Sequence, residues 1–361
     1  MRGMGSEVGA GGEGGMGGER GEVGAGAGTE HAVERAADRL ARRRVGMVLG
    51  GGRSGGVHVT ARGDTGRGAA PDARTLFEIG SVTKTFTALL LADGVLRGQW
   101  ALDTPVRDLL PAGVGVPSRD GVQITLQHLA THTSGLPRTP GRLGIRENVA
   151  YLRTGADPYA GLSQDDVLRA LPGAKLSRVP GSGKPKYSNL GFGLLGTALT
   201  TATGLDYGSL VRDRICVPLG MTDTVVDDQM TTDQRQRMAV GHRRRRRTAE
   251  PWPLPGIPGA GALRSTATDM LRFLAAQVDP PDTGLGEAVR LTHATPPGGP
   301  GEMGLGWHRA GPRTLWHNGG TGGFRSIAIV TPDSRVVTLA LVNQTRGADL
   351  TAFRLMRRID G

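Results

Sequence analysis

The chain is poor in several residue types, and each shortage narrows what the protein can be. It has a single Cys among 361 residues, so no internal disulfide can form, and no Cys/His spacing is typical of a zinc site. No apolar run reaches roughly 18 residues, which excludes an ordinary transmembrane helix. Aromatic residues make up only 4% of the chain, and no finger, RNP or zipper motif accompanies the net charge of +11. Nucleic acid is therefore not expected as a partner.

Lysine is scarce as well, although the chain is strongly basic. Of the 44 Lys and Arg residues only four are Lys, and one of these, Lys84, follows Ser81 by three residues in the stretch EIGSVTKTFTALL. Arg keeps its proton in proteins, whereas burial and neighbouring charges can lower the pKa of a Lys amine until it loses its own. We therefore expect position 84 to require a base.

Glycine is in excess, with 60 residues in the chain, and it crowds the N-terminus. This tract lacks the apolar core of a signal peptide and cannot bury enough surface to offset its chain entropy. Residues 1–29 are predicted to be a disordered tail, and without a visible export signal we expect a cytoplasmic protein. The one dense basic run, residues 243–247, lies between loop-like segments and is interpreted as a solvated loop.

Strand patterns lie at both ends of the chain and helix patterns lie between them. A helix is predicted from Thr29 as N-cap to Arg44, and two strands follow at residues 45–51 and 56–63. Residues 81–96 predict a helix, and helical patterns continue to about residue 280. Strand patterns return beyond residue 300.

This order predicts an α+β fold. Strands from the two ends are most simply joined in one antiparallel sheet flanked by helices, with a mostly helical lobe against it. We divide the folded domain, residues 30–361, into a sheet lobe of about 30–100 and 285–361 and a helical lobe of about 101–284. The cleft between the lobes is the expected site.

Three glycine-containing patterns resemble functional motifs but lack the surroundings that these motifs need. Residues 50–55 and 191–196 fit GxGxxG, yet neither stretch lies between a strand and a helix as a dinucleotide site requires, so no cofactor is expected. Ser54 fits GxSxG, but a β-branched alternating segment follows it instead of a helix. We interpret Ser54 as part of a hairpin turn.

Ser81 stands in a more promising context. In the first turn of a helix it shares a face with Lys84, whose amine can then reach the hydroxyl. The start of the helix also supplies partial positive charge and a backbone N–H where an oxyanion would form. The alternative is an N-capping Ser followed by a surface Lys.

A second motif, Tyr187-Ser188-Asn189, precedes another predicted helix. Tyr187 could transfer a proton, and the amide of Asn189 could hold a substrate amide as donor and acceptor. The alternative is a packed Tyr followed by a helix cap at Ser188 or Asn189.

A third motif lies in residues 315–324, LWHNGGTGGF, where a strand runs into a Gly-rich turn. There His317 could face a cleft, while Gly319 and Gly320 would let a substrate approach the backbone. The alternative is a simple strand-end hairpin.

In this order, S-x-x-K, Y-S-N and H-N-G resemble the signature of the serine β-lactamase and penicillin-binding-protein superfamily. The similarity is to its class C β-lactamase, esterase and D-amino-acid-peptidase branch, and it covers about residues 45–345. Segments such as LFEIGSVTKTFTALLLADGV, ITLQHLATHTSGLP and GALRSTATDMLRFL carry it further. The resemblance implies a β-lactamase/transpeptidase-like fold and a serine hydrolase that acts, through an acyl-enzyme, on a small-molecule ester, D-amino-acid peptide or β-lactam.

The resemblance also implies roles for the motif residues. Ser81 would be the nucleophile, and Lys84 and Tyr187 would share the acid and base work. Either Lys84 is neutral, or it stays charged and stabilises Tyr187 as a phenolate; both schemes stay open here. The substrate-binding and oxyanion residues would be Asn189, His317, Asn318, Gly319 and Gly320, with the N–H of Ser81 as the second oxyanion donor.

One departure bears on the substrate. His317 stands where members that hydrolyse antibiotics typically carry Lys, and a mostly neutral His holds a carboxylate less firmly. This favours an esterase or D-peptide hydrolase over an efficient β-lactamase, although Arg325 could restore some anion binding. The alternative function is a catalytically weak penicillin-binding-like protein that captures peptidoglycan-type ligands.

Overall fold

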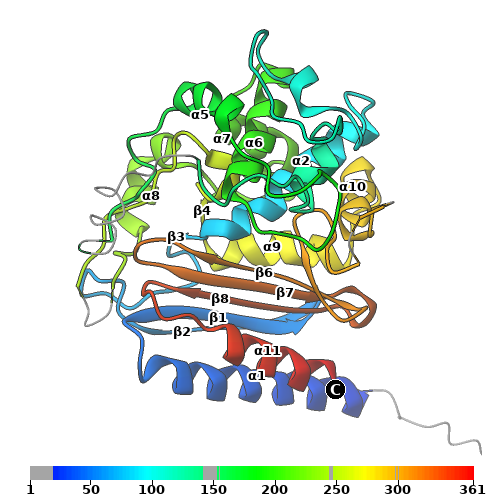
Figure 1. The fold of residues 1–361 in the computed structure, drawn as a ribbon. Helices are drawn as coiled ribbons and strands as arrows, with labels where there is room; N and C mark the ends of the chain where they lie inside the picture. Colours follow the sequence, from blue (N-terminus) through cyan, green and yellow to red (C-terminus); the bar gives the residue numbers. More distant parts are fainter. Residues whose placement is uncertain (1–18, 141–152, 154, 244–246, 297, 300) are drawn as a thin grey trace, which may run out of the picture.

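An antiparallel sheet of six strands forms the base of the molecule in the computed structural model (Figure 1). The structure describes residues 19–140, 153, 155–243, 247–296, 298–299 and 301–361. The strand order is β2-β1-β8-β7-β6-β5. The strands are β1 (Gly46–Arg53), β2 (Gly56–Gly63), β5 (His308–Ala310), β6 (Thr314–Gly320), β7 (Arg325–Thr331) and β8 (Val336–Val342).

The two ends of the chain meet at the pairing of β1 with β8. In this register Leu49 lies opposite Ala340 on one side and opposite Thr60 of β2 on the other. The predicted α+β fold, with one antiparallel sheet built from both ends, is confirmed.

Helices cover both faces of this sheet (Figure 1). On one face α1 (Glu19–Ala41) and α11 (Asp349–Asp360) bury a small core with residues such as Val33, Ile327 and Leu355. On the other face α9 (Ala267–Val278) packs against β1, β7 and β8. The proposed lobe boundary at residue 284 placed α9 in the helical lobe, whereas the helix lies directly on the sheet.

The remaining helices lie above α9 in Figure 1, and the helix at residues 83–96 runs through their middle. Every residue from Thr83 to Gly94 in that helix is buried. The α-helices not yet given are α2 (Thr83–Leu96), α3 (Leu126–Ala130), α5 (Gln164–Ala170), α6 (Asn189–Thr203), α7 (Tyr207–Val211), α8 (Thr232–Arg237) and α10 (Gly284–His293).

The first helix corrects one sequence prediction. It begins at Glu19, so residues 19–29 are helical instead of disordered, and Thr29 is not the N-cap. The first turn of a helix costs free energy, whereas each further residue adds a hydrogen bond for a small loss of entropy. A helix whose C-terminal half is packed on the sheet can therefore extend into a Gly-rich stretch. The rest of the predicted tail, residues 1–18, lies outside the described residues.

The GxSxG and GxGxxG patterns serve the turn between β1 and β2 and the close packing of α6. Ser54 lies in the tight turn between β1 and β2, where its N–H donates to the carbonyl of Arg335 over 2.8 Å, so the predicted hairpin is confirmed. Within α6, a Cβ on Gly196 would lie 3.1 Å from Cα of Gly259, and a Cβ on Gly193 would lie 2.4 Å from the side chain of Ile257. Glycine therefore lets α6 approach the 257–259 segment closely.

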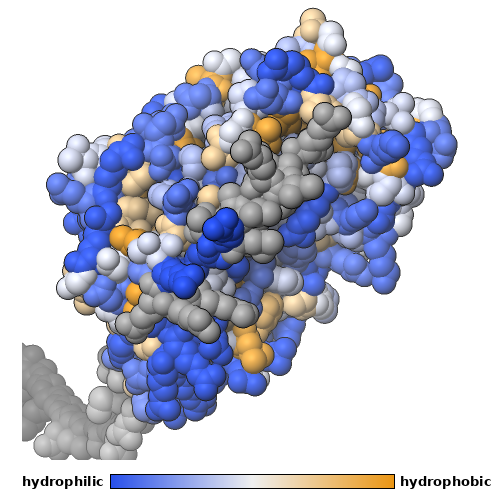
Figure 2. Space-filling view, turned by 60° about the vertical axis from the view of Figure 1, so that its left-hand side comes forward, coloured by the Kyte–Doolittle hydropathy of each residue, from blue (hydrophilic) through white to orange (hydrophobic). Residues whose placement is uncertain are grey.

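The surface offers no simple indication of function. On the face in Figure 2 hydrophilic residues predominate, and hydrophobic ones form small separate groups. Among the described residues no helix is both apolar enough and long enough to span a bilayer. The predicted solvated loop at 243–247 falls partly on residues 244–246, which lie outside the described residues.

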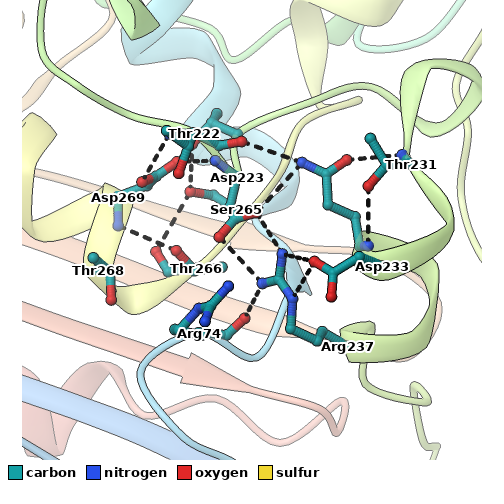
Figure 3. A network of polar contacts seen from close by, with 12 residues as sticks. Arg74, Thr222, Asp223, Thr231, Asp233, Arg237, Ser265, Thr266, Thr268 and Asp269 are labelled. Carbon is teal, nitrogen blue, oxygen red and sulfur yellow. Dashed lines mark hydrogen bonds and ion pairs between the residues drawn. The ribbon is translucent and has the colours of Figure 1, made fainter.

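A buried polar network anchors the segment between α7 and α9 (Figure 3). The carboxylate of Asp269, at the start of α9, accepts the backbone N–H of Asp223 over 2.7 Å and the hydroxyl of Thr224 over 2.9 Å. The same hydroxyl lies 2.8 Å from that of Ser265 in β4 (Arg264–Ser265). Since β4 pairs with β3 (Phe77–Glu78), which leads into residues 79–81, the network supports the strand that precedes Ser81.

Candidate active site

Ser81 lies at a junction between the helices and the sheet. After β3 the chain makes a single 3-10 turn, Gly80–Val82, and then enters α2, so Ser81 stands just before the helix. Gly80 adopts φ +50°, and a Cβ there would lie 2.7 Å from the backbone nitrogen of Gly320. Only glycine allows this approach, which sets the end of β6 against the turn that holds Ser81.

Lys84 is fully buried, so the alternative of a surface Lys is wrong. Its Nζ lies 3.2 Å from Ser81 Oγ, and it donates to Asn189 Oδ1 over 3.0 Å and to the carbonyl of Ala260 over 2.6 Å. The first and second motifs, far apart in the chain, therefore meet at this amine. Burial, assisted by the charge of Arg138, lowers the pKa of Lys84 well below its ordinary value.

Tyr187 completes the group around the hydroxyl. It shares a hydrogen bond with Ser81, and its ring centroid lies 4.9 Å from Lys84 Nζ. The guanidinium carbon of Arg138 lies 5.0 Å from the same ring. Burial raises the pKa of Tyr187 to about 12, against the opposing effects of the Ser81 hydrogen bond and the Arg138 charge. The phenol is therefore protonated at neutral pH.

The two residues after Tyr187 do both things that the second motif suggested: one caps a helix, and the other directs its amide toward Lys84. Ser188 is the N-cap of α6, and its hydroxyl accepts the N–H of Gly191 over 2.9 Å. Asn189 begins the helix, accepts from Lys84, and donates through Nδ2 to the hydroxyl of Tyr159 over 3.3 Å. A cap at position 188 thus orients the amide at position 189.

His317 of the third motif lies beside this group but is buried, with 1% of its surface exposed. Its Nδ1 donates to the carbonyl of Asn318 over 2.7 Å, and its ring centroid is 6.2 Å from that of Tyr187. Burial, followed by the charges of His308 and Lys84, lowers the pKa of His317 well below its ordinary value. It is therefore a neutral imidazole in the wall of the site.

The two glycines of this motif lie against the Ser81 turn. A Cβ on Gly319 would be 2.0 Å from the carbonyl oxygen of Ile79, and one on Gly320 would be 2.7 Å from Arg325 Nη1. The Arg325 guanidinium donates to the carbonyls of Thr321 and Phe324 over 2.9 and 2.7 Å. The cation predicted past the glycines therefore lies next to Gly320.

Asn318 is the predicted site residue that the structure does not bring to this group. Its Nδ2 donates to Asp349 Oδ1 over 2.6 Å, and Asp349 begins α11 on the other face of the sheet. Successive side chains along a strand point to opposite faces, so with His317 toward Tyr187 the side chain of Asn318 points away. The Asn318 side chain therefore lies apart from the other predicted site residues.

Sequence reasoning also missed several residues. Tyr159 and Ala260 hold Asn189 and Lys84, and the segment of residues 131–138, THTSGLPR, lies along the second motif. The carbonyl of Arg138 accepts the N–H of Asn189 over 2.8 Å. In the sequence the 131–138 segment stands out only through the family resemblance, since a turn that acts through its carbonyls leaves no side-chain pattern. In the described part of the chain no three metal-ligating side chains converge to hold an ion.

A buried carboxylate, Glu78, lies three residues before Ser81. It is 2% exposed, accepts the N–H of Trp252 over 2.8 Å, and lies 3.5 Å from the buried guanidinium of Arg264. Burial raises the pKa of Glu78 from 4.5 to about 7, although the Arg264 charge opposes the shift. The folded protein therefore holds this proton more tightly than the unfolded chain does.

We expect this carboxylate to make stability fall with rising pH. The contribution is complete below about pH 4.5 and is lost as pH rises through about 7; the shift corresponds to about 3 kcal/mol. Glu78→Gln should remove this dependence and unfold at higher urea concentration than wild type at pH 8. The exposed Glu250→Gln is the control in urea titrations from pH 4.5 to 8. A Glu78→Gln protein less stable than wild type at pH 8 would mean that the Arg264 ion pair outweighs burial.

Comparisons with known proteins agree with this geometry. The Beta-lactamase family model matches residues 30–360. The D-alanyl-D-alanine-carboxypeptidase/endopeptidase AmpH of Escherichia coli (strain K12) is 31% identical over 313 residues, which cover 81% of this chain and 76% of AmpH. Esterase EstB of Burkholderia gladioli is 36% identical over 195 residues, which cover 50% of this chain and 47% of EstB.

A solved structure is also similar. The crystal structure of a beta-lactamase/D-alanine carboxypeptidase from Yersinia pestis complexed with citrate matches with a TM-score of 0.78 and 26% identity, covering 92% of this chain and 97% of that one. The family match spans the sheet and the helices that carry the predicted motifs. The chain therefore belongs to the Beta-lactamase family and is a serine hydrolase.

Proposed function

We propose that Ser81 attacks an ester or a D-amino-acid peptide, and that water then releases the acyl group. The observation that carries this proposal is the buried Lys84 amine, which contacts both the Ser81 hydroxyl and the Asn189 amide. A buried amine with a lowered pKa beside a hydroxyl is the arrangement that activates a serine nucleophile. Perturbed groups that converge in this way are typical of catalytic sites.

The pKa directions favour one of the two protonation schemes. A neutral Lys84 can accept the Ser81 proton, and a Tyr187 with a pKa of about 12 is a proton donor and not a phenolate. The opposite assignment would require a charge on the fully buried Lys84 amine and another on the partly buried Tyr187 phenol, and desolvation disfavours both charges.

The acylation step then follows from these positions. The proton of Ser81 moves to Lys84 Nζ while Oγ bonds to the substrate carbonyl carbon, and the carbonyl oxygen gains the negative charge. The backbone N–H groups of Ser81 and Gly320, which the close approach at Gly80 brings together, would donate to that oxyanion. As the tetrahedral intermediate collapses, the bond to the leaving group breaks and Tyr187 gives it a proton. The proton taken up by Lys84 then passes to Tyr187, so that the amine is neutral and the phenol protonated before water attacks. Water repeats the sequence on the acyl-enzyme, with the Ser81 oxygen as leaving group.

The choice of substrate rests on the third motif. A buried neutral His317 offers no positive charge to a substrate carboxylate. Esters, and D-amino-acid peptides whose carboxylate lies outside the site, are therefore favoured over β-lactams, in line with a carboxypeptidase/endopeptidase and an esterase among the relatives.

A substrate panel with a covalent probe tests the proposal. A fluorophosphonate should label the protein on the peptide that contains Ser81, and p-nitrophenyl butyrate should give a burst followed by steady turnover. A D-Ala-D-Ala peptide with an amidated C-terminus should be hydrolysed faster than nitrocefin. Labelling of Ser81 with a burst but no steady turnover would support the alternative, a penicillin-binding-like protein that captures its ligand. Labelling elsewhere would refute both.

A further inference from the structure

We propose that His132 is a positioning residue that keeps the phenol of Tyr187 within hydrogen-bond reach of Ser81. The inference rests on the proposed function, in which Tyr187 is the proton donor. His132 is 2% exposed and belongs to the 131–138 segment, which the three sequence motifs do not include.

The main chain and side chain of His132 bracket Tyr187. Its carbonyl accepts the N–H of Lys186 over 2.8 Å, and its ring Nδ1 accepts the N–H of Ser188 over 3.2 Å. One residue thus fixes the backbone on both sides of the tyrosine. His132 achieves this in a left-handed conformation, with φ +58°, which is uncommon for a residue other than glycine. Strained backbone of this kind is concentrated at functional sites.

The imidazole also fixes the plane of the phenol ring. The ring centroids of His132 and Tyr187 are 4.5 Å apart, and the ring of Phe192 lies 4.9 Å from that of His132. The phenol therefore packs against an imidazole that α6 supports. Lys84 Nζ and Arg138 Cζ also lie close to the phenol ring. A Tyr held by its backbone and its ring has little freedom to swing away from Ser81.

The protonation of His132 agrees with this role. Because Nδ1 accepts a backbone N–H, the ring proton of the neutral imidazole is on Nε2, which is buried without a hydrogen-bond partner among the described residues. An unpaired buried donor costs stability. A residue kept at that cost, with its other nitrogen on the catalytic segment, serves the site more than the fold.

The test separates positioning of the phenol from general damage by varying the leaving group. An alkoxide needs a proton as it leaves, whereas the fluoride of a fluorophosphonate does not. His132→Gly, which suits the left-handed backbone, should lower kcat/KM for an ethyl ester about 30-fold, within the range of acid–base effects. The rate of Ser81 labelling by the fluorophosphonate should change less than threefold. Equal losses in the two reactions would overturn the inference.

A double-mutant cycle with Tyr187→Phe adds a second readout. If His132 acts through the phenol, its removal should have almost no further effect on ethyl-ester hydrolysis once the hydroxyl is gone. Additive losses would overturn the inference. A Tyr187→Phe protein with wild-type activity would overturn the role of Tyr187 as the acid as well. If Tyr187→Phe loses activity and His132→Gly does not, only the role of His132 is overturned.

Two more variants distinguish the loss of the His132 contacts from misfolding. His132→Asn tolerates the left-handed backbone and keeps an acceptor near the Nδ1 position, so it should recover part of the loss even if His132→Gly does not fold. His128→Ala is the matched control. His128 Nδ1 accepts the N–H of Thr125 at the start of α3, so this change should lower stability and leave the ratio of the two reaction rates within twofold. A changed ratio in His128→Ala, or no recovery in His132→Asn, would count against the inference.

Discussion

Ser81→Ala is expected to reduce kcat/KM for p-nitrophenyl butyrate on the order of 10⁴-fold or more, as in other enzymes that lose a nucleophile. The hydroxyl is the group that Lys84 and Tyr187 both contact, so its removal leaves an amine and a phenol with nothing to activate. Lys84 keeps Asn189 and the Ala260 carbonyl as partners, so the fold should survive.

Steady-state hydrolysis and fluorophosphonate labelling both check this result, with circular dichroism to confirm folding. The control is Ser54→Ala, which changes the serine of the GxSxG pattern in the β1–β2 turn and should behave as wild type. If Ser81→Ala keeps more than a tenth of the wild-type rate, or if Ser54→Ala loses activity, the assigned nucleophile is wrong.

Lys84→Arg is expected to lower kcat/KM about 10³-fold, within the range measured for loss of a general base. The substitution keeps a positive charge but cannot supply a base, because a guanidinium does not lose its proton in proteins. It also places a larger, planar group in a fully buried site shaped for one amine and its three oxygen partners. Wild-type activity should fall as pH falls through the lowered pKa of Lys84, since the base works without its proton.

The matched control is Lys184→Arg, the same exchange at a side chain that is 88% exposed. It should change kcat/KM less than twofold. Lys84→Met, which removes the charge and keeps the length, should be as inactive as Lys84→Arg if the missing function is a base. A Lys84→Arg enzyme with near-normal activity would show that a fixed positive charge suffices, and would restore the phenolate scheme.

Local spacing explains why part of the site could be predicted. Ser81 and Lys84 are three residues apart on one helical turn, and their contact over 3.2 Å follows from that spacing. Short strand-like runs in the regions of β1 and β8 likewise predicted strands at both ends, and their pairing joins the two ends in the sheet. Periodicity did not reveal the two-residue strands β3 and β4, which are too short to show it.

The differences between prediction and structure arise where a neighbour distant in the chain decides the outcome. Asn318 was grouped with His317 by adjacency, but the alternation of a strand turns it toward Asp349. Residues 19–29 have a disorder-prone composition, yet they extend a helix whose other half packs on the sheet. His132 acts largely through a carbonyl and a ring nitrogen, and neither feature forms a recognisable pattern in the sequence.

The amino-acid sequence by itself determined the family, the order of the three motifs and the presence of Lys84 in a chain whose other basic residues are mostly Arg. The tertiary structure alone decided that this lysine is buried, that Asn189 and Ala260 surround it, and that Tyr187 stays protonated beside it. The physical reason is that a pKa depends on desolvation and on nearby dipoles and charges. In this protein those groups come from segments more than a hundred residues apart.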